Sequence, residues 1–183
     1  MISKAEYKQA QHRAAEMIRD AGIPVRPEEF EKIEVADFGL ENLEAEGAQI
    51  LTLFATERIA GKVIVLLPGQ SLPEHWHGPV GDDPGKQEVL RVAAGSCCCV
   101  RPGGNSLRFA TIPEGKQDAY TCRQETVMRQ GDQLVLEPGT KHWLQAGPQG
   151  AVVYSFSTCA RDALDEFTDP QVVRRTVIAD ADE

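Results

Sequence analysis

The first part of the chain carries a hydrophobic pattern with helical spacing. Apolar residues recur every three or four positions over residues 3–21, and polar or charged residues fill the positions between them. Ser3 and Glu6 form a capping-box pattern at the start, while Gly22 and Pro24 end the periodicity. The pattern therefore predicts one amphipathic helix near the N-terminus.

From about residue 48 the pattern becomes that of short β-strands. Runs rich in β-branched and apolar residues alternate with Gly and Pro turns, and no second helical block large enough for a βαβ sheet follows. The predicted strands are ILTLFA, KVIVLLP, EVLRVAAG, SCCCV, AYTCR, QLVLEP and AVVYSFS. This arrangement predicts an all-β protein, a sandwich or a barrel, with a short N-terminal helical segment before it.

The same pattern divides the chain into three parts. Residues 1–47 form a helical and extended lead-in that packs on the barrel, with one or two further helical turns at 27–33, and residues 48–170 form the β-barrel. Residues 171–183 form a polar C-terminal tail whose acidic end, ADADE, we expect to fray. A single domain is typical of a chain of 183 residues.

Composition and charge limit the kinds of partner that the protein is expected to bind. Apolar residues make up 42% of the chain and charged residues 26%, an ordinary mix for a globular domain. The net charge is −9, and an acidic surface repels phosphate backbones and anionic lipids, so we expect no nucleic acid or membrane partner. The longest aliphatic run, Val63–Leu67, is far short of a membrane span, and the charged N-terminus lacks the apolar region of a secretory signal. We therefore expect a soluble, cytoplasmic protein.

The cysteines agree with a reducing compartment. There are five, and Cys97, Cys98 and Cys99 are consecutive, so neighbouring thiols would point to opposite faces of a strand. Such a run cannot form a disulfide framework, and its spacing does not match a zinc site built from paired thiolates. We interpret these cysteines as small apolar residues of a buried strand.

Three of the four histidines lie in a pattern that is typical of metal ligation. His75 and His77 are two positions apart, so on an extended segment both imidazoles project from the same face. Glu88 begins a later strand, and His142 follows the turn at Pro138–Gly139. Three imidazoles and one carboxylate suit a divalent transition ion better than Ca²⁺ or Mg²⁺. On an octahedral ion they leave two positions open, enough to chelate a substrate through two oxygens.

The spacing around these residues resembles that of the cupin superfamily. A His-x-His pair alone is equally consistent with a surface or core pair, whereas the whole string is more specific. It runs Gly69, five residues, His75-Trp76-His77, ten residues, Glu88, six residues, Gly95, and later Gly131, six residues, Pro138-Gly139, two residues, His142. Cupins are small jelly-roll-like β-barrels that hold a metal ion in the barrel mouth. The chain departs from their usual motifs in its long spacer after His77 and in Ala146, which stands where Asn is usual.

Longer segments are similar to the D-lyxose isomerase family of cupins. They are PGQSLPEHWHGPVGDDPGKQE, TKHWLQAGPQGAVV, FTDP, ADFGLENLE and LFATERIAGKVIVLLPGQ, and the resemblance covers roughly residues 22–171. The long spacer, GPVGDDPGKQ, is part of that family's pattern. The resemblance implies a single cupin-type barrel, a homodimer, and interconversion of D-lyxose with D-xylulose, often also of D-mannose with D-fructose. It also implies that His75, His77, Glu88 and His142 bind Mn²⁺, or alternatively Fe²⁺, Co²⁺, Ni²⁺ or Zn²⁺.

Proton transfer between C1 and C2 of a sugar needs a further group beside the metal. Lys86 precedes Glu88 by two residues and shares its inward face if the strand has already begun; otherwise it is a solvated loop lysine. Glu166 and Asp169 lie in DEFTDP, and the resemblance places the matching acidic residues near the sugar. We expect Lys86 and Glu166 to be catalytic, and Lys86 and Asp169 to bind the substrate.

Nearby carboxylates have simpler interpretations. Thr168-Asp169-Pro170 also fits the start of a helix, with a polar N-cap and Pro at the first helical position. Glu74 adjoins His75, so strand alternation aims it away from the metal, and we expect it at the rim of the site.

Two other functions use the same residues. An Fe²⁺ cupin dioxygenase has the same ligand set of three His and one Glu, and it would lose activity without oxygen. A non-catalytic sugar-binding cupin would keep the fold with a structural metal. An isomerase needs neither oxygen nor a cosubstrate, and we expect it to move the proton through a cis-enediol, with a direct hydride shift as the alternative. The family resemblance favours the isomerase.

Overall fold

The N-terminal helix forms where its capping box predicts it. The computed structural model describes residues 1–179, and helix α1 (Lys4–Asp20) begins after Ser3, whose Oγ accepts a hydrogen bond from the Glu6 backbone N–H. The Glu6 carboxylate accepts one from the Ser3 N–H in return. The predicted further turns form a 3₁₀ helix, η1 (Pro27–Lys32). Both helical predictions are confirmed.

Most of the remaining regular structure is strand, as the all-β prediction requires. The strands are β1 (Ile2–Ser3), β2 (Glu34–Ala36), β3 (Ala48–Ala55), β4 (Ile59–Leu66), β5 (Ser71–Trp76), β6 (Glu88–Arg101), β7 (Gln124–Arg129), β8 (Gln133–Leu136), β9 (His142–Thr158), β10 (Glu166–Phe167) and β11 (Ile178–Ala179), and a second 3₁₀ helix, η2 (Asp162–Leu164), precedes β10. EVLRVAAG and SCCCV, predicted as separate strands, are the two ends of β6.

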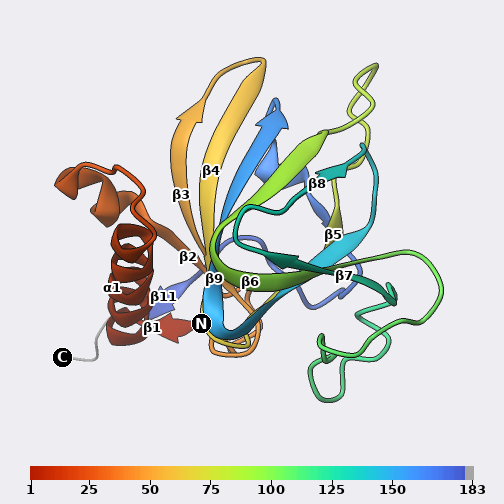
Figure 1. Cartoon of the computed structure of the whole chain (residues 1–183), viewed down its shortest axis with the longest axis horizontal. Coiled ribbons are helices and arrows are strands. Elements are labelled where there is room, and N and C mark those ends of the chain that lie inside the picture. Colours follow the sequence, from red (N-terminus) through yellow and green to blue (C-terminus); the bar gives the residue numbers. More distant parts are fainter. Residues whose placement is uncertain (180–183) are drawn as a thin grey trace.

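Strands β6 and β9 each belong to two half-sheets and thereby fold the sheet into a barrel. The end of β9 pairs with β4 and with the beginning of β6, and β3, β2 and β8 extend this first half-sheet. The beginning of β9 pairs with β5 and with the end of β6, and β10 and β7 extend this second half-sheet. Figure 1 shows the two half-sheets curling over each other, with α1 outside them. The arrangement is the jelly-roll-like barrel that the sequence predicts.

Glycines make the bend where the two shared strands cross from one half-sheet to the other. The register between β6 and β9 shifts between Gly95 and Cys97, and Gly95 has a φ of 72°. A Cβ atom on Gly95 would lie 2.1 Å from the carbonyl oxygen of Gly150. The two backbones therefore approach too closely here for a side chain on Gly95.

Apolar residues pack on both faces of the first half-sheet. The barrel interior contains Leu66, Leu90, Leu136, Leu144 and Val153 among others. On the outer face, Ala14, Ala15 and Ile18 of α1 pack against Leu51, Val63, Val65 and Val152. The lead-in therefore stabilises the barrel by covering part of one outer face.

The three consecutive cysteines are buried on both sides of β6. Cys97 and Cys99 lie in the barrel interior, and Cys98 packs in an outer cluster with Tyr120 and Trp143. Burial raises the pKa of the Cys97 thiol to about 12 and that of Cys98 to about 11, so both remain protonated at neutral pH. All five cysteines are free. The interpretation as apolar strand residues is confirmed.

One strand prediction and one helix prediction need correction, and strand β7 is not predicted. AYTCR is not a strand, because the Cys122 N–H donates to the Glu74 carboxylate (2.7 Å) rather than to a neighbouring strand. The strand that pairs with SCCCV is β7, whose sequence QETVMR is mostly polar because it pairs on one edge only. Asp169 begins a turn and not a helix: the Val172 N–H donates to its carbonyl, and the Val173 N–H then donates to Phe38.

Residues 171–179 run back along the barrel toward α1. Arg174 forms an ion pair with Glu34, the Thr176 hydroxyl donates to the carbonyl of Val35 (2.9 Å), and β11 pairs in parallel with β1. The fraying predicted for ADADE concerns residues 179–183; Ala179 is part of β11, and residues 180–183 lie outside the described residues. Within residues 1–179, no helix is long and apolar enough to cross a membrane.

Candidate metal centre

A small cavity lies inside the barrel between the two half-sheets. Its volume is about 40 Å³. Its apolar lining consists of Phe38, Ile50, Ile64, Leu72, Leu90, Leu144 and Phe167. Its polar lining consists of Lys62, His75, His77, Lys86, Glu88, His142, Ser155, Asp162, Asp165 and Arg174. The barrel therefore encloses an unusually dense group of titratable side chains.

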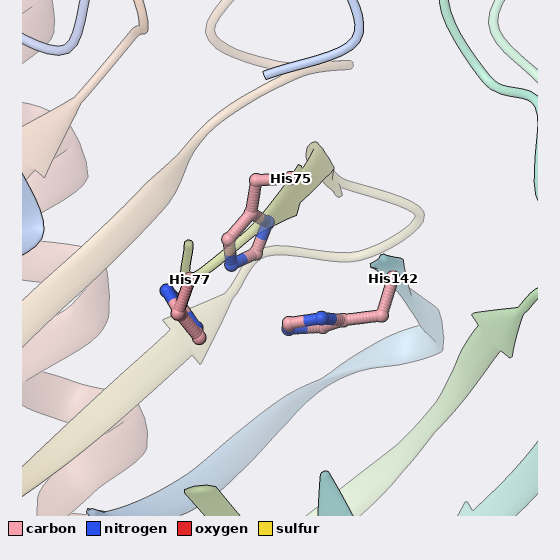
Figure 2. A group of neighbouring side chains, drawn as sticks. All are labelled: His75, His77 and His142. Carbon is pink, nitrogen blue, oxygen red and sulfur yellow. The ribbon is translucent and has the colours of Figure 1, made fainter. Parts of the chain in front are cut away.

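Three of these side chains are histidines that meet from neighbouring strands. His75 is in β5 and His142 begins β9, and the two are partners in the register of that strand pair. His77 follows the end of β5. The ring centroids lie 4.3 Å apart for His75 and His142, 5.1 Å for His75 and His77, and 5.5 Å for His77 and His142. One nitrogen of each ring lies within 4.8 Å of the other two, and Figure 2 shows the rings grouped around a common space.

The Nδ1 atom of each ring is occupied by a hydrogen bond. The acceptor is the carbonyl of Pro73 for His75 (2.8 Å), and the carbonyl of Thr140 for His142 (2.9 Å). For His77 the partner is a carboxylate oxygen of Asp165, at 2.6 Å. Since a carbonyl only accepts, the Nδ1 atoms of His75 and His142 carry the protons, and their Nε2 atoms keep lone pairs for a metal ion.

Glu88 completes the group from the opposite half-sheet. Its Oε2 lies 3.3 Å from Nε2 of His77 and 3.8 Å from Nε2 of His142. Its Oε1 accepts a hydrogen bond from the hydroxyl of Ser155 and lies 3.9 Å from Nζ of Lys86. The structure thus brings together the four side chains that the sequence indicates as metal ligands.

Burial and neighbouring charges set the protonation states. Burial, reinforced by the neighbouring imidazoles, lowers the pKa of His75 well below its usual value. Burial also lowers the pKa of His142 to about 4. For Glu88 burial acts in the opposite sense, but the charge of Lys86 and the hydrogen bond from His77 outweigh it and hold the pKa well below the usual value. For His77 the bonds to Asp165 and Glu88 outweigh burial and raise its pKa.

This donor set fits a divalent transition ion. At neutral pH His75 and His142 are neutral imidazoles and Glu88 is a carboxylate, which are the protonation states that metal ligation requires. Nitrogen and oxygen donors of this kind suit Mn²⁺, Fe²⁺, Co²⁺, Ni²⁺ and Zn²⁺. A metal-binding centre is therefore consistent with the geometry and the charges of the cavity.

Comparison with known proteins identifies the family. No family model matches the chain. A D-lyxose ketol-isomerase of Cohnella laeviribosi is 47% identical over 174 residues, which are 94% of this chain and 96% of that protein. A D-lyxose/D-mannose isomerase of Thermosediminibacter oceani is 41% identical over 181 residues, which are 98% of this chain and 100% of that protein. The chain belongs to the D-lyxose isomerase family.

Solved structures of L-ribose isomerases share the fold of this D-lyxose isomerase family member. The enzyme of Cellulomonas parahominis without ligand has a TM-score of 0.82 at 20% identity, over 97% of this chain and 98% of that chain. The enzyme of Acinetobacter sp. DL28 in complex with L-ribose has a TM-score of 0.80 at 15% identity, with the same coverage. The predicted fold class and the predicted family are both confirmed.

Lys86 lies beside the histidines in this D-lyxose isomerase family member. Only 10% of its side chain is exposed, and its Nζ lies 3.9 Å from Oε1 of Glu88 and 3.9 Å from Oδ1 of Asp162. Asp162 also forms an ion pair with Lys62. Burial opposes ionisation of Asp162, but Lys62 and Lys86 outweigh it and lower its pKa. The alternative of a solvated loop lysine does not describe Lys86.

Glu166 and Asp169 are not part of this group. Glu166 is paired with Trp76 in the register of β10 and β5, and its carboxylate accepts a hydrogen bond from the indole N–H of Trp76 (3.0 Å) on the exposed side of the strand. Asp169 is buried elsewhere, where its carboxylate pairs with Lys116 (2.5 Å). Neither side chain lines the cavity, because strand pairing turns Glu166 outward and the turn at Asp169 follows β10.

Glu74 is buried, contrary to its expected place at the rim. Its carboxylate accepts hydrogen bonds from the hydroxyls of Thr121 and Thr168, both at 2.7 Å, and from the Cys122 N–H. The alternation argument is correct in that Glu74 points away from the histidines. What it misses is that two loops cover the other face of β5 there.

Among the charged residues of the cavity that sequence reasoning misses are Asp162 and Asp165. Both follow β9 in a segment with no hydrophobic periodicity, so nothing in the pattern sets their direction. The available signal is a cluster of acidic residues directly after the last long strand. Lys62 lies on the inward face of β4, and the sequence does not indicate it because it stands within a run of apolar residues.

Proposed function

We propose that the protein is a metal-dependent aldose–ketose isomerase that interconverts D-lyxose and D-xylulose, and also D-mannose and D-fructose, through a cis-enediol. The observation that carries the proposal is the meeting of three imidazoles and one ionised carboxylate in an enclosed cavity. The 47% identity with a D-lyxose ketol-isomerase supports the reaction, and a relative named for D-mannose as well as D-lyxose supports the pair of substrates.

We propose that His75, His77, Glu88 and His142 hold the metal ion, with Mn²⁺ as the first choice. The convergence of all four side chains and the protonation states of His75, His142 and Glu88 support this ligand set. The chemistry that such an ion supplies when bound is Lewis-acid polarisation of a carbonyl or hydroxyl oxygen. Ser155 supports the site by donating a hydrogen bond to Glu88, which holds that carboxylate in place.

Lys86 and Asp162 are the side chains that we propose for proton transfer between C1 and C2. The Lys86 ammonium lies between the carboxylates of Glu88 and Asp162, on the cavity, where it can donate a hydrogen bond to a sugar oxygen and stabilise negative charge there. The ionised Asp162 can accept a proton. We propose Asp162 for the role in which the sequence indicates Glu166, because its position on the cavity supports contact with the substrate.

The dioxygenase and the non-catalytic sugar binder are less well supported. A dioxygenase fits the ligands but not the names of the two relatives described above, both of which are isomerases. A binder with a structural metal needs no Lys86–Asp162 ion pair on the cavity beside it. Both alternatives remain outcomes of the experiment below.

We also propose a cytoplasmic homodimer. Five free cysteines support the compartment. Four apolar side chains, which we call the outer apolar row, cross the outer face of the first half-sheet in register: Phe54, Phe156, Val89 and Val135. Phe54, Phe156 and Val135 are exposed, and a second copy would remove them from water.

The experiment strips the protein with a chelator, restores Mn²⁺, and follows D-lyxose, D-mannose and D-xylose by NMR in D₂O without oxygen. We expect metal-dependent formation of xylulose and fructose, with deuterium at C1 of the ketose. A His142→Gln variant, purified in the same way, controls for contaminating isomerases. No ketose from any sugar, with the metal demonstrably bound, would exclude the isomerase, and activity that appears only with oxygen would indicate the dioxygenase.

A further inference from the structure

The histidines of the candidate metal centre differ in what orients them. Those of β5 and β9, His75 and His142, donate to carbonyls only two residues earlier in the chain. His77 instead faces a side chain 88 residues away, with its Nδ1 atom 2.6 Å from Oδ1 of Asp165. The His77 side chain is buried and that of Asp165 is partly buried, with 6% and 13% of their surface exposed. The orientation of His77 therefore depends on a distant segment.

That segment is held against the barrel by contacts of its own. We call residues 161–167 the strap. At one end Arg161 donates a hydrogen bond to Asp83 (3.0 Å), and at the other end β10 pairs with β5. Within the described residues, the carboxylate of Asp165 has no hydrogen-bond partner other than His77. The strap therefore fixes Asp165 in place. Among the described residues, His77 is the side chain to which the Asp165 carboxylate is hydrogen-bonded.

We propose that Asp165 is a positioning residue that fixes His77 as a metal ligand, so that retention of the metal depends on the strap. The proposal rests on the proposed metal site. A carboxylate only accepts, so the bond to Asp165 keeps a proton on Nδ1, and Nε2, which faces Glu88, is then the nitrogen that would give up its proton to a metal ion. Nε2 of His77 is the nitrogen that lies 3.3 Å from Glu88, on the side of the other ligands.

The physical reason for a charged partner is that His77 has no local acceptor. Without Asp165, the ring could rotate or take the other tautomer, and either change would remove the lone pair from the centre. An amide at this position is a weaker choice, because its NH₂ group can donate to Nδ1 and favour the wrong tautomer. Partners of this kind typically change metal affinity by about 10- to 100-fold.

The test compares Asp165→Asn with the wild-type protein in equilibrium dialysis against Mn²⁺, with Co²⁺ absorption as a second readout of ligand geometry. We expect the Kd for Mn²⁺ to rise by about 10- to 100-fold, and the Co²⁺ spectrum to change. Glu16→Gln is the matched control, because Glu16 also binds an imidazole, that of His12 (3.2 Å), but on the exposed face of α1. That variant should bind Mn²⁺ as the wild type does.

A double-mutant cycle shows whether Asp165 acts through His77. In a His77→Gln background, Asp165→Asn should change the Kd by less than about twofold. If Asp165→Asn does not fold, as judged by circular dichroism, Asp165→Glu and Asp165→Gln form the comparison, because they are equal in size and differ in charge. The Glu variant should then bind Mn²⁺ more tightly than the Gln variant.

The outcomes separate this proposal from the proposed function. A folded Asp165→Asn protein with wild-type affinity would overturn the positioning role, as would an undiminished effect in the His77→Gln background. Wild-type protein that binds no metal ion would instead overturn the proposed metal site itself.

Discussion

At the scale of single residues, the candidate site is built from hydrogen bonds that fix the direction of each imidazole. His75 and His142 take their acceptors from the backbone beside them, so short sequence motifs carry nearly all the information for those two ligands. His77 and Glu88 depend on residues far away in the chain, namely Asp165 and Ser155. Locally oriented ligands are therefore predictable from spacing, whereas the orientation of the others depends on the fold.

Replacing Lys86 tests the proposed proton transfer. Lys86→Met keeps the length of the side chain and removes the charge between Glu88 and Asp162, so we expect kcat to fall by about 100-fold or more. Steady-state kinetics on D-lyxose measure the change, and metal analysis should give an unaltered Mn²⁺ content. The exposed Lys32, replaced in the same way, should leave kcat unchanged. A Lys86→Met enzyme of normal kcat would contradict the catalytic role.

At the scale of elements, the sequence predicts the helices and strands that have a regular hydrophobic pattern and misses those that lack one. The capping box and the apolar spacing identify α1, and apolar runs identify β3 and β4. β7 is not predicted because a strand that is paired on one edge needs few apolar residues. AYTCR has the alternation of a strand, yet the buried Glu74 binds its backbone at Cys122. In that segment a side-chain acceptor replaces a neighbouring strand.

Gly95 is the position in β6 where the addition of one methyl group should lower the stability of the protein. Gly95→Ala would put a Cβ atom against the carbonyl of Gly150 and place a non-glycine residue at positive φ. We expect it to lower the free energy of unfolding by about 2–5 kcal/mol. Urea denaturation measures the change. Gly104→Ala is the control, because a Cβ there has open space and no positive φ. Equal stabilities would contradict the tight crossing of β6 and β9.

At the scale of the whole molecule, the candidate metal centre joins the two half-sheets. His75 and His142 belong to the second half-sheet, whereas Glu88 is paired in the first. His77 adds the strap through Asp165. An ion held by all four ligands therefore links three separate parts of the barrel, and its binding free energy stabilises their assembly.

Removing the metal should accordingly lower the thermal stability of the whole barrel. At a free Mn²⁺ concentration of about 100 times Kd, binding contributes about 2.7 kcal/mol, which corresponds to a Tm shift of about 5–10 °C for a chain of this size. Calorimetry with and without chelator measures the shift. His142→Gln should show a much smaller response to Mn²⁺. A chelator-independent Tm in a protein that binds Mn²⁺ would contradict the linkage.

The outer apolar row makes a prediction about assembly. Phe156→Lys puts a charge in the middle of this row, so we expect the proposed dimer to dissociate into monomers of 20.0 kDa. Sedimentation velocity measures the mass. Phe109→Lys is the control, because Phe109 is exposed on a loop away from the row. A dimer that persists in Phe156→Lys would place the interface on another face, and a monomeric wild type would exclude the homodimer.

The late position of β9 in the chain determines when the barrel can close during synthesis. β9 is one of the two strands that both half-sheets share, and it is also the last long strand to leave the ribosome. Its first residue is His142, and the strap with Asp165 follows it. A nascent chain without β9 lacks the strand that pairs with β4, β5 and β6, and it contains only two of the three histidines of the site. Closure of the barrel and burial of its edges must therefore come after translation of β9, and so must assembly of the proposed metal site, since His142 and Asp165 are among its residues.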